Sequence, residues 1–134
     1  MGYWYEEAVF YHIYPLGLTG APRENHNEAG NGFEKLKLWI PHMKKMGFTA
    51  LYIGPLFESS THGYDTKDYR TVDIRLGKNE DFKEALKGLR RGAFVYLDPP
   101  YMPISSSSSF TGYTENGFNE DKQRELKELC DKLD

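Results

Sequence analysis

The sequence predicts a small α/β protein, with a parallel sheet of about three strands and flanking helices in the order βαβαβα. Short apolar runs alternate along the chain with stretches whose apolar residues recur at helical spacing. The apolar runs lack strict polar alternation, as expected when both faces of a parallel sheet are covered. A length of 134 residues is typical of one domain. We therefore expect residues 1–134 to form a single α/β domain.

The predicted strands are the apolar runs. Residues 8–14 are rich in aromatic side chains and end at Pro15. Residues 49–55 form a second run that also ends at a proline. Residues 93–97 form a third, which Asp98 and two prolines interrupt at once. Proline ends a strand because it has no N–H to donate to the sheet.

The predicted helices come from amphipathic stripes. The first ends at Gly47, a candidate C-terminal cap, and contains Pro41, which should kink the helix or start a second short one. The polar residues 16–31 before it are expected to form a loop. Asn119 is a candidate N-cap of the last helix, and Cys130 on its stripe is expected in the core. The stripes consist of Phe33, Leu36, Ile40 and Met43, then Phe82, Ala85, Leu86 and Leu89, then Leu126, Leu129, Cys130 and Leu133.

Composition limits the classes of function. Seventeen basic and twenty acidic residues give a net charge of −3, which is too acidic to attract a nucleic-acid backbone by charge alone. No apolar run approaches the ~20 residues that span a membrane, and the N-terminus lacks the basic segment of a secretory signal. A single cysteine, Cys130, excludes an internal disulfide and suits a reducing compartment. We therefore expect a cytoplasmic protein without a membrane partner.

Residues 8–84 resemble the start of the α-amylase family of glycoside hydrolases. The resemblance rests on several motifs in the order and spacing of that family: residues 9–15 (VFYHIYP), 32–36 (GFEKL), 46–57 (MGFTALYIGPLF) and 62–69 (HGYDTKDY). In the family these motifs form the first two strand–helix units of a (β/α)8 barrel, which takes ~250 residues. The resemblance implies that Tyr64 stacks on the sugar at the cleavage point, with Asp65 and Asp68 in the same loop.

The resemblance stops before the catalytic carboxylates. Glycoside hydrolysis needs two carboxylates that flank the scissile bond. In the α-amylase family these residues follow later strands, and none of the corresponding motifs occurs in the sequence. We therefore expect Tyr64, Asp65 and Asp68 to be the vestige of a sugar-binding site.

Residues 81–134 resemble the Dam-type adenine-specific DNA methyltransferases. The matching motifs are residues 81–85 (DFKEA), 92–101 (GAFVYLDPPY), 110–113 (FTGY) and 117–118 (GF), although Ala93 stands where the family often has aspartate. The tetrapeptide Asp98, Pro99, Pro100 and Tyr101 is the catalytic loop of that family. The resemblance implies that Asp98 and the Pro99 carbonyl accept hydrogen bonds from the adenine amino group, while Tyr101 stacks on the flipped base.

The cofactor half of that site is missing from the sequence. In the methyltransferase family, S-adenosylmethionine binds on an earlier Phe-x-Gly-x-Gly loop. Here Gly30 and Gly32 flank Asn31, but no predicted strand directly precedes them. The tetrapeptide alone is also compatible with a purely structural role, in which its two prolines fix the backbone and end the third strand. We therefore expect no cofactor, with S-adenosylmethionine as the cofactor only if methyl transfer survives.

No metal site is predicted. The four histidines do not cluster, and their spacing matches no zinc motif. His12 falls in a strand and His42 next to the helix proline, whereas His26 and His62 fall in loops. We expect core or loop roles for all four.

The two resemblances meet within the predicted helix at residues 81–86. We interpret the chain as a chimera, engineered, generated or recombinant, with no complete catalytic site. It joins an α-amylase-like segment (1–84) to a methyltransferase-like segment (85–134). Two alternatives stay open: a fragment with residual adenine-N6 DNA methyltransferase function, and an α-amylase-family carbohydrate-active fragment.

Two expectations follow from the narrow sheet. Its exposed edges favour a homodimer through those edges. If all strands are parallel, the loops that carry Tyr64 and Tyr101 lie at the same, carboxyl edge. Two tyrosines and two acids could then form a shallow crevice that binds a sugar ring or a purine. Nucleic acid and carbohydrate are otherwise not expected as partners.

Overall fold

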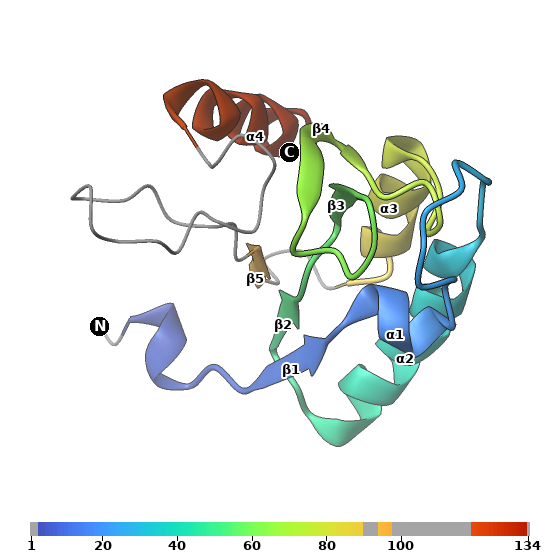
Figure 1. Ribbon diagram of the computed structural model, residues 1–134. Coiled ribbons are helices and arrows are strands. Elements are labelled where there is room, and N and C mark those ends of the chain that lie inside the picture. Colours follow the sequence, from blue (N-terminus) through green and yellow to red (C-terminus); the bar gives the residue numbers. More distant parts are fainter. Residues whose placement is uncertain (1–2, 90–93, 98–118, 134) are drawn as a thin grey trace.

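The computed structural model describes residues 3–89, 94–97 and 119–133. Its helices and strands alternate as expected for the α/β class (Figure 1). No helix within these ranges is long and apolar enough to cross a lipid bilayer. The elements are η1 (Trp4–Glu6), β1 (Phe10–Ile13), α1 (Pro15–Thr19), α2 (Gly32–Met46), β2 (Ala50–Ile53), β3 (Phe57–Ser59), β4 (Thr66–Val72), α3 (Asn79–Leu86), β5 (Phe94–Leu97) and α4 (Glu120–Leu133).

A parallel sheet of three strands forms the centre of the fold, in the order β1-β2-β5. Leu51 in the central strand pairs with Tyr11 on one side and with Val95 on the other. The connection from β1 to β2 contains α2, and the connection from β2 to β5 contains α3. Parallel neighbours need such crossovers because a tight turn cannot join them. The predicted fold class, a small parallel sheet with flanking helices, is confirmed.

β3 and β4 form a second, antiparallel sheet that the sequence analysis did not predict. β4 buries Thr66, Tyr69 and Val72, with exposed or half-buried polar residues between them. These buried residues are three apart instead of two, and the β3–β4 register shifts on both sides of Glu58. The period of two that marks a half-buried strand is therefore absent from β4, and β3 has only three residues to show it.

Two helices differ from the prediction. α1 lies within the stretch expected to be a loop; it begins with a proline and ends at Gly20, whose φ of 68° is left-handed. α2 continues through Pro41 as one helix, so the alternative of a second short helix is wrong. The two predicted caps are confirmed. Gly47 ends α2 with a φ of 83°, and Asn119 accepts a backbone hydrogen bond of 3.0 Å at the start of α4.

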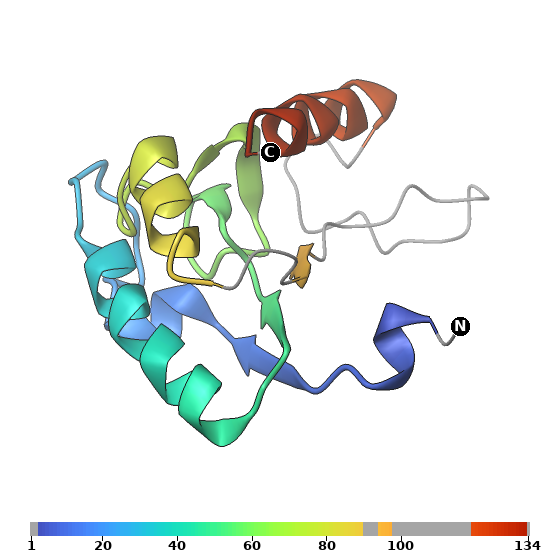
Figure 2. The same cartoon turned by 180° about the vertical axis from the view of Figure 1, so that it is seen from behind.

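The core joins α2, α3 and α4 to the two sheets. α2 and α3 lie side by side (Figure 2), and the rings of Phe33 and Phe82 are 5.3 Å apart. Leu129 of α4 is buried in the same cluster, whereas Cys130 is exposed. The prediction of a core Cys130 is therefore wrong, because one further residue turns its side chain about 100° around the helix. The cluster consists of Ile13, Leu16, Phe33, Leu36, Met43, Leu51, Ile53, Leu56, Phe57, Tyr69, Val72, Leu76, Phe82, Ala85 and Leu129.

One face of β1 is open, so the expectation that both faces of the sheet are covered is wrong at this edge strand, although Ala50 on the same face of β2 is buried. Tyr11 packs its ring 4.8 Å from that of Phe48 on the covered side. Phe10 remains 43% exposed, and His12 is also exposed, with its ring stacked 4.4 Å from that of Tyr52. Alternate residues of a strand share a face, so Phe10 and His12 leave this side of β1 accessible to solvent.

Candidate functional site

A buried ion pair anchors the segments that follow β3 and β4. Asp73 and Arg75 come directly after β4, and both side chains are buried. Arg75 Nε donates to Asp73 Oδ1 at 2.8 Å, and Arg75 Nη2 donates to Asp73 Oδ2 at 2.7 Å. Ser59 Oγ donates to the same Asp73 Oδ2 at 2.7 Å. A bidentate pair of this kind fixes the plane of the guanidinium as well as its position.

The other terminal nitrogen of Arg75 binds backbone carbonyls. Arg75 Nη1 donates to the carbonyl oxygens of Thr61 at 2.7 Å, Pro22 at 2.8 Å and Arg23 at 3.0 Å. These acceptors belong to two segments far apart in the sequence. Arg75 therefore holds the loop before α2 against residues 60–65, the turn that carries the predicted sugar-binding side chains.

Hydrogen bonds fix the conformation of this turn. Asp65 accepts from Thr61 Oγ1 at 2.9 Å and from the backbone N–H of Gly63 at 3.2 Å. The backbone N–H of Tyr64 donates to His62 Nδ1 at 3.2 Å. Gly63 has a φ of 96°, and a Cβ there would lie 2.6 Å from a Pro55 carbon, so only glycine fits. The turn leaves Tyr64 57% exposed and Asp65 partly buried.

The carboxylate of Asp65 is held in its charged form. Partial burial raises its pKa, but hydrogen bonds from Thr61 and from backbone N–H groups, with the nearby His62, outweigh burial. The pKa of Asp65 therefore lies below its ordinary value. A carboxylate in this state accepts hydrogen bonds from a ligand and is a poor proton donor.

Asp65 is expected to make stability depend on pH only in the acidic range. Because its folded-state pKa is lowered, its contribution is fully present above the unfolded-state value of about 4 and is lost as the pH falls through the folded pKa. Urea unfolding between about pH 6 and about pH 2.5 should show a smaller loss of stability for Asp65→Asn than for the wild type. Equal losses in both proteins would contradict this role of the carboxylate.

Tyr14 lies beside the turn, at the carboxyl end of β1. Its hydroxyl donates to the His62 carbonyl at 2.6 Å, and burial, followed by the nearby Tyr64, raises the pKa of Tyr14. The rings of His62 and Tyr64 are 6.0 Å apart. Gly17 makes room for the Tyr14 ring, because a Cβ there would lie 2.7 Å from it. We call Tyr14, His62, Tyr64 and Asp65 the tyrosine cluster.

Two of the predicted sugar-binding residues, Tyr64 and Asp65, come together in this cluster. Asp68 does not join them. It lies in β4, where it accepts hydrogen bonds from the backbone N–H of Arg70 at 2.8 Å and from the Thr71 hydroxyl at 3.3 Å. Sequence reasoning missed Tyr14, for which the only signal was its place as the last residue of a predicted strand, at the edge where α/β proteins bind ligands.

The predicted methyltransferase residues Asp98, Pro99, Pro100 and Tyr101 lie outside the described residues. The predicted crevice between Tyr64 and Tyr101 lies outside them for the same reason. Among the described residues, the ring that lies near Tyr64 is that of His62, and the carbonyl of His62 binds the Tyr14 hydroxyl.

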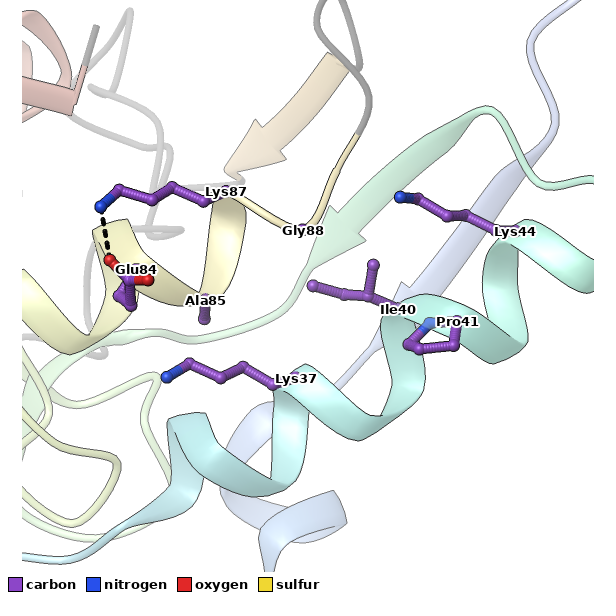
Figure 3. Close-up of a pocket in the computed structure, with 8 residues that line it drawn as sticks. All are labelled: Lys37, Ile40, Pro41, Lys44, Glu84, Ala85, Lys87 and Gly88. Carbon is purple, nitrogen blue, oxygen red and sulfur yellow. Dashed lines mark hydrogen bonds and ion pairs between the residues drawn. The ribbon is translucent and has the colours of Figure 1, made fainter.

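A groove of about 430 Å³ opens between α2 and the end of α3 (Figure 3). Its apolar lining comes from Ile40, Pro41 and Ala85, and Gly88 lines it just after α3. The remaining lining residues are charged: Lys37, Lys44, Glu84 and Lys87. Lys87 pairs with Glu84 at 2.5 Å inside the groove, and Lys37 pairs with Glu34 outside it at 2.6 Å. We call this feature the lysine groove.

The backbone at Gly30 and Gly32 has no open space beside it. Gly30 and Gly32 are packed against the chain after β4: a Cβ at Gly30 would lie 1.8 Å from the Arg75 carbonyl oxygen, and one at Gly32 would lie 2.7 Å from the Leu76 side chain. These glycines therefore serve the packing of the α2 N-terminus. In residues 3–89, 94–97 and 119–133, the His, Cys, Asp and Glu side chains form no group of three that could hold a metal ion.

The fold and the tyrosine cluster define a small α/β protein with an aromatic and carboxylate site at the carboxyl edge of its parallel sheet. A family model described as D12 class N6 adenine-specific DNA methyltransferase matches residues 65–134, just over half of the chain. The chain therefore belongs to the D12 class of N6 adenine-specific DNA methyltransferases.

Similar proteins come from two families. The type II methyltransferase M.MjaIII of Methanocaldococcus jannaschii is 52% identical over 69 residues, which cover 52% of this chain and 23% of that protein. The oligo-1,6-glucosidase of Bacillus sp. (strain F5) is 31% identical over 104 residues, which cover 73% of this chain and 19% of that protein. The solved cyclic α-maltosyl-(1→6)-maltose hydrolase of Arthrobacter globiformis is 29% identical with a TM-score of 0.53, covering 69% of this chain and 25% of that one.

These findings confirm the prediction of a chimera. The chain joins part of a glycoside hydrolase of the α-amylase family to part of an adenine-specific DNA methyltransferase. It spans 19% of the length of the glucosidase and 23% of the length of the methyltransferase. This coverage agrees with the interpretation of a chimera without a complete catalytic site of either kind.

Proposed function

We infer that the chain is a binding module, and that its tyrosine cluster binds a sugar ring weakly without cleaving it. The observation that carries this proposal is that one turn presents the exposed ring of Tyr64 and, at the next residue, the charged carboxylate of Asp65. An aromatic face supports the apolar face of a pyranose ring, and a fixed carboxylate accepts hydrogen bonds from its hydroxyl groups. Arg75 and Gly63 hold this turn in place before any ligand arrives, which lowers the entropy cost of binding.

The carboxylates of this region argue against hydrolysis. A glycosidase needs one carboxyl group that donates a proton and a second that acts as nucleophile or base. Asp65 stays charged, so it is a poor acid. Asp73, the other carboxylate tied to this turn, is fully buried, and its oxygens are occupied by Arg75 and Ser59. The described part of this site therefore supplies no pair of working carboxylates.

Titration with maltose tests the proposal. We expect millimolar binding by the wild type, corresponding to about −4 kcal/mol. Tyr64→Ala should weaken it about tenfold, because the stacking surface is lost. Tyr3→Ala is the matched control, since Tyr3 is also exposed but lies in the segment before β1. Absence of binding by the wild type, or release of glucose from maltose, would contradict the proposal.

Adenine-N6 methylation is the second candidate function, and the family match over residues 65–134 favours it. The sequence retains Asp98, Pro99, Pro100 and Tyr101, which would receive the target adenine. Gly30 and Gly32 do not fit S-adenosylmethionine, so the cofactor would need residues from outside the described part. Transfer of a labelled methyl group from S-adenosylmethionine to an adenine-containing oligonucleotide would support this function over the binding module.

We propose that residues 1–134 form one domain, in which an α-amylase-like segment (1–84) joins a methyltransferase-like segment (85–134) near the end of α3. We also propose a cytoplasmic location, which the single Cys130 favours. A homodimer through the sheet edges remains a proposal, supported by the position of β1 at an edge of the sheet.

A further inference from the structure

The lysine groove is a surface of mixed apolar and cationic character. Ile40 and Ala85 are buried beneath it, and Lys37, Lys44 and Lys87 extend along it in the same general direction (Figure 3). Three lysines against one glutamate leave an excess of positive charge in its lining. Within the part of the chain that the structure describes, Lys44 has no acidic partner, whereas Lys37 and Lys87 each have one. The groove therefore suits a partner that is apolar and acidic.

The N-terminal segment, residues 3–7, has this complementary character. Tyr3 is 66% exposed and Tyr5 is 54% exposed, and their rings stack 5.2 Å apart. Glu6 and Glu7 follow them, and both are exposed. The Glu6 carboxylate accepts the backbone N–H of Tyr3 at 3.1 Å, which gives the segment a defined shape. In the described part of the chain, Glu7 makes no ion pair.

The segment lies far from the groove of its own chain. Figures 1 and 2 both place η1 at the opposite side of the molecule from α3. The two surfaces can therefore meet only between different copies. A contact that joins unlike surfaces of identical chains leaves one free surface of each kind at the ends of the assembly.

We propose that the N-terminal segment of one copy docks in the lysine groove of a second copy. The tyrosine rings cover the apolar lining formed by Ile40, Pro41 and Ala85, and Glu7 meets Lys44. This head-to-tail contact lets assemblies grow beyond a dimer as the concentration rises. It is independent of sugar binding and uses a surface different from the sheet edges.

Sedimentation velocity of the full chain at low salt, over a range of concentrations, tests this contact. We expect the sedimentation coefficient to rise with concentration and to fall back when salt screens the charges. Glu7→Lys and Lys44→Glu should each weaken association about fivefold or more, because like charges then face each other. The double variant that carries both changes should restore association to within about twofold of the wild type.

Matched controls distinguish loss of this contact from a general effect of changing the net charge of the protein. Lys45→Glu changes the same last turn of α2 but lies outside the groove lining, and Glu28→Lys changes an exposed acid outside the N-terminal segment. Both should associate like the wild type. A wild type that is monomeric at all concentrations overturns the proposal. So does association that the Glu7 and Lys44 variants leave unchanged, a result that would favour the sheet edges instead. Equal effects of test and control variants also overturn it.

Discussion

Asp73→Ala is expected to cost about 3–5 kcal/mol of folding stability, the largest effect of any substitution proposed for this chain. The change leaves the guanidinium of Arg75 buried without its charge partner. It also removes the acceptor of the Ser59 hydroxyl. Arg75 loses the hydrogen bonds to Asp73 that orient its guanidinium toward the carbonyls of Thr61 and Pro22. Urea unfolding followed by circular dichroism measures the loss.

Asp68→Ala is the matched control for this prediction. Asp68 also faces an arginine, Arg70, but their side chains are 33% and 60% exposed. An exposed pair contributes only about 0–1 kcal/mol because water screens it. A second variant, Asp73→Leu combined with Arg75→Met, should recover part of the loss, since removal of both charges removes the desolvation penalty. An Asp73→Ala protein as stable as Asp68→Ala would contradict the account of the ion pair.

Leu129→Ala is expected to cost about 2–5 kcal/mol, the range for a large buried side chain truncated in a core. Leu129 belongs to α4 in the methyltransferase-like segment, yet it is buried in the same cluster as residues of the α-amylase-like segment. α4 also packs against β4, where Arg70 Nη2 and Glu125 Oε1 lie 3.7 Å apart. If the two segments share one core, the substitution should lower the stability of the whole chain in a single transition.

The control for this prediction is the next residue of the same helix. Cys130 is exposed, so Cys130→Ala should change stability by less than about 0.5 kcal/mol. Hydrogen exchange distinguishes the two possible outcomes for Leu129→Ala. Faster exchange in β2 as well as in α4 supports a shared core. Faster exchange confined to α4 would show that the segments unfold separately and would overturn the single-domain proposal.

The parallel sheet could be predicted because its signals are local. Each strand is a short apolar run that ends at proline or aspartate, and α2 and α3 carry their buried residues at helical spacing. β3 and β4 escaped prediction because their buried residues follow an irregular register. A covered second face was wrongly expected for β1, because Phe10 is apolar but exposed. The sequence shows that a residue is apolar. Whether another element covers that residue depends on the fold.

The candidate site could be predicted only where its residues are neighbours in sequence. Tyr64 and Asp65 were found through a motif, and they do lie together. Tyr14 contacts the same turn from 48 residues away, and Arg75 reaches back 53 residues to Pro22. A pattern within a single segment of the chain cannot predict contacts between residues so far apart in the sequence. They follow from the crossovers that bring the loops to one edge of the sheet.

The contact between Arg75 and Arg23 has a consequence for cleavage by trypsin-like proteases. Such an enzyme attacks the carbonyl carbon of the arginine itself and must draw the surrounding backbone into its own cleft. The carbonyl of Arg23 is already bound to Arg75 Nη1, although Arg23 itself is exposed. The side chain of Arg23 is thus accessible at the surface, but a protease can cut the peptide bond after it only when the hydrogen bond between its carbonyl and Arg75 has opened.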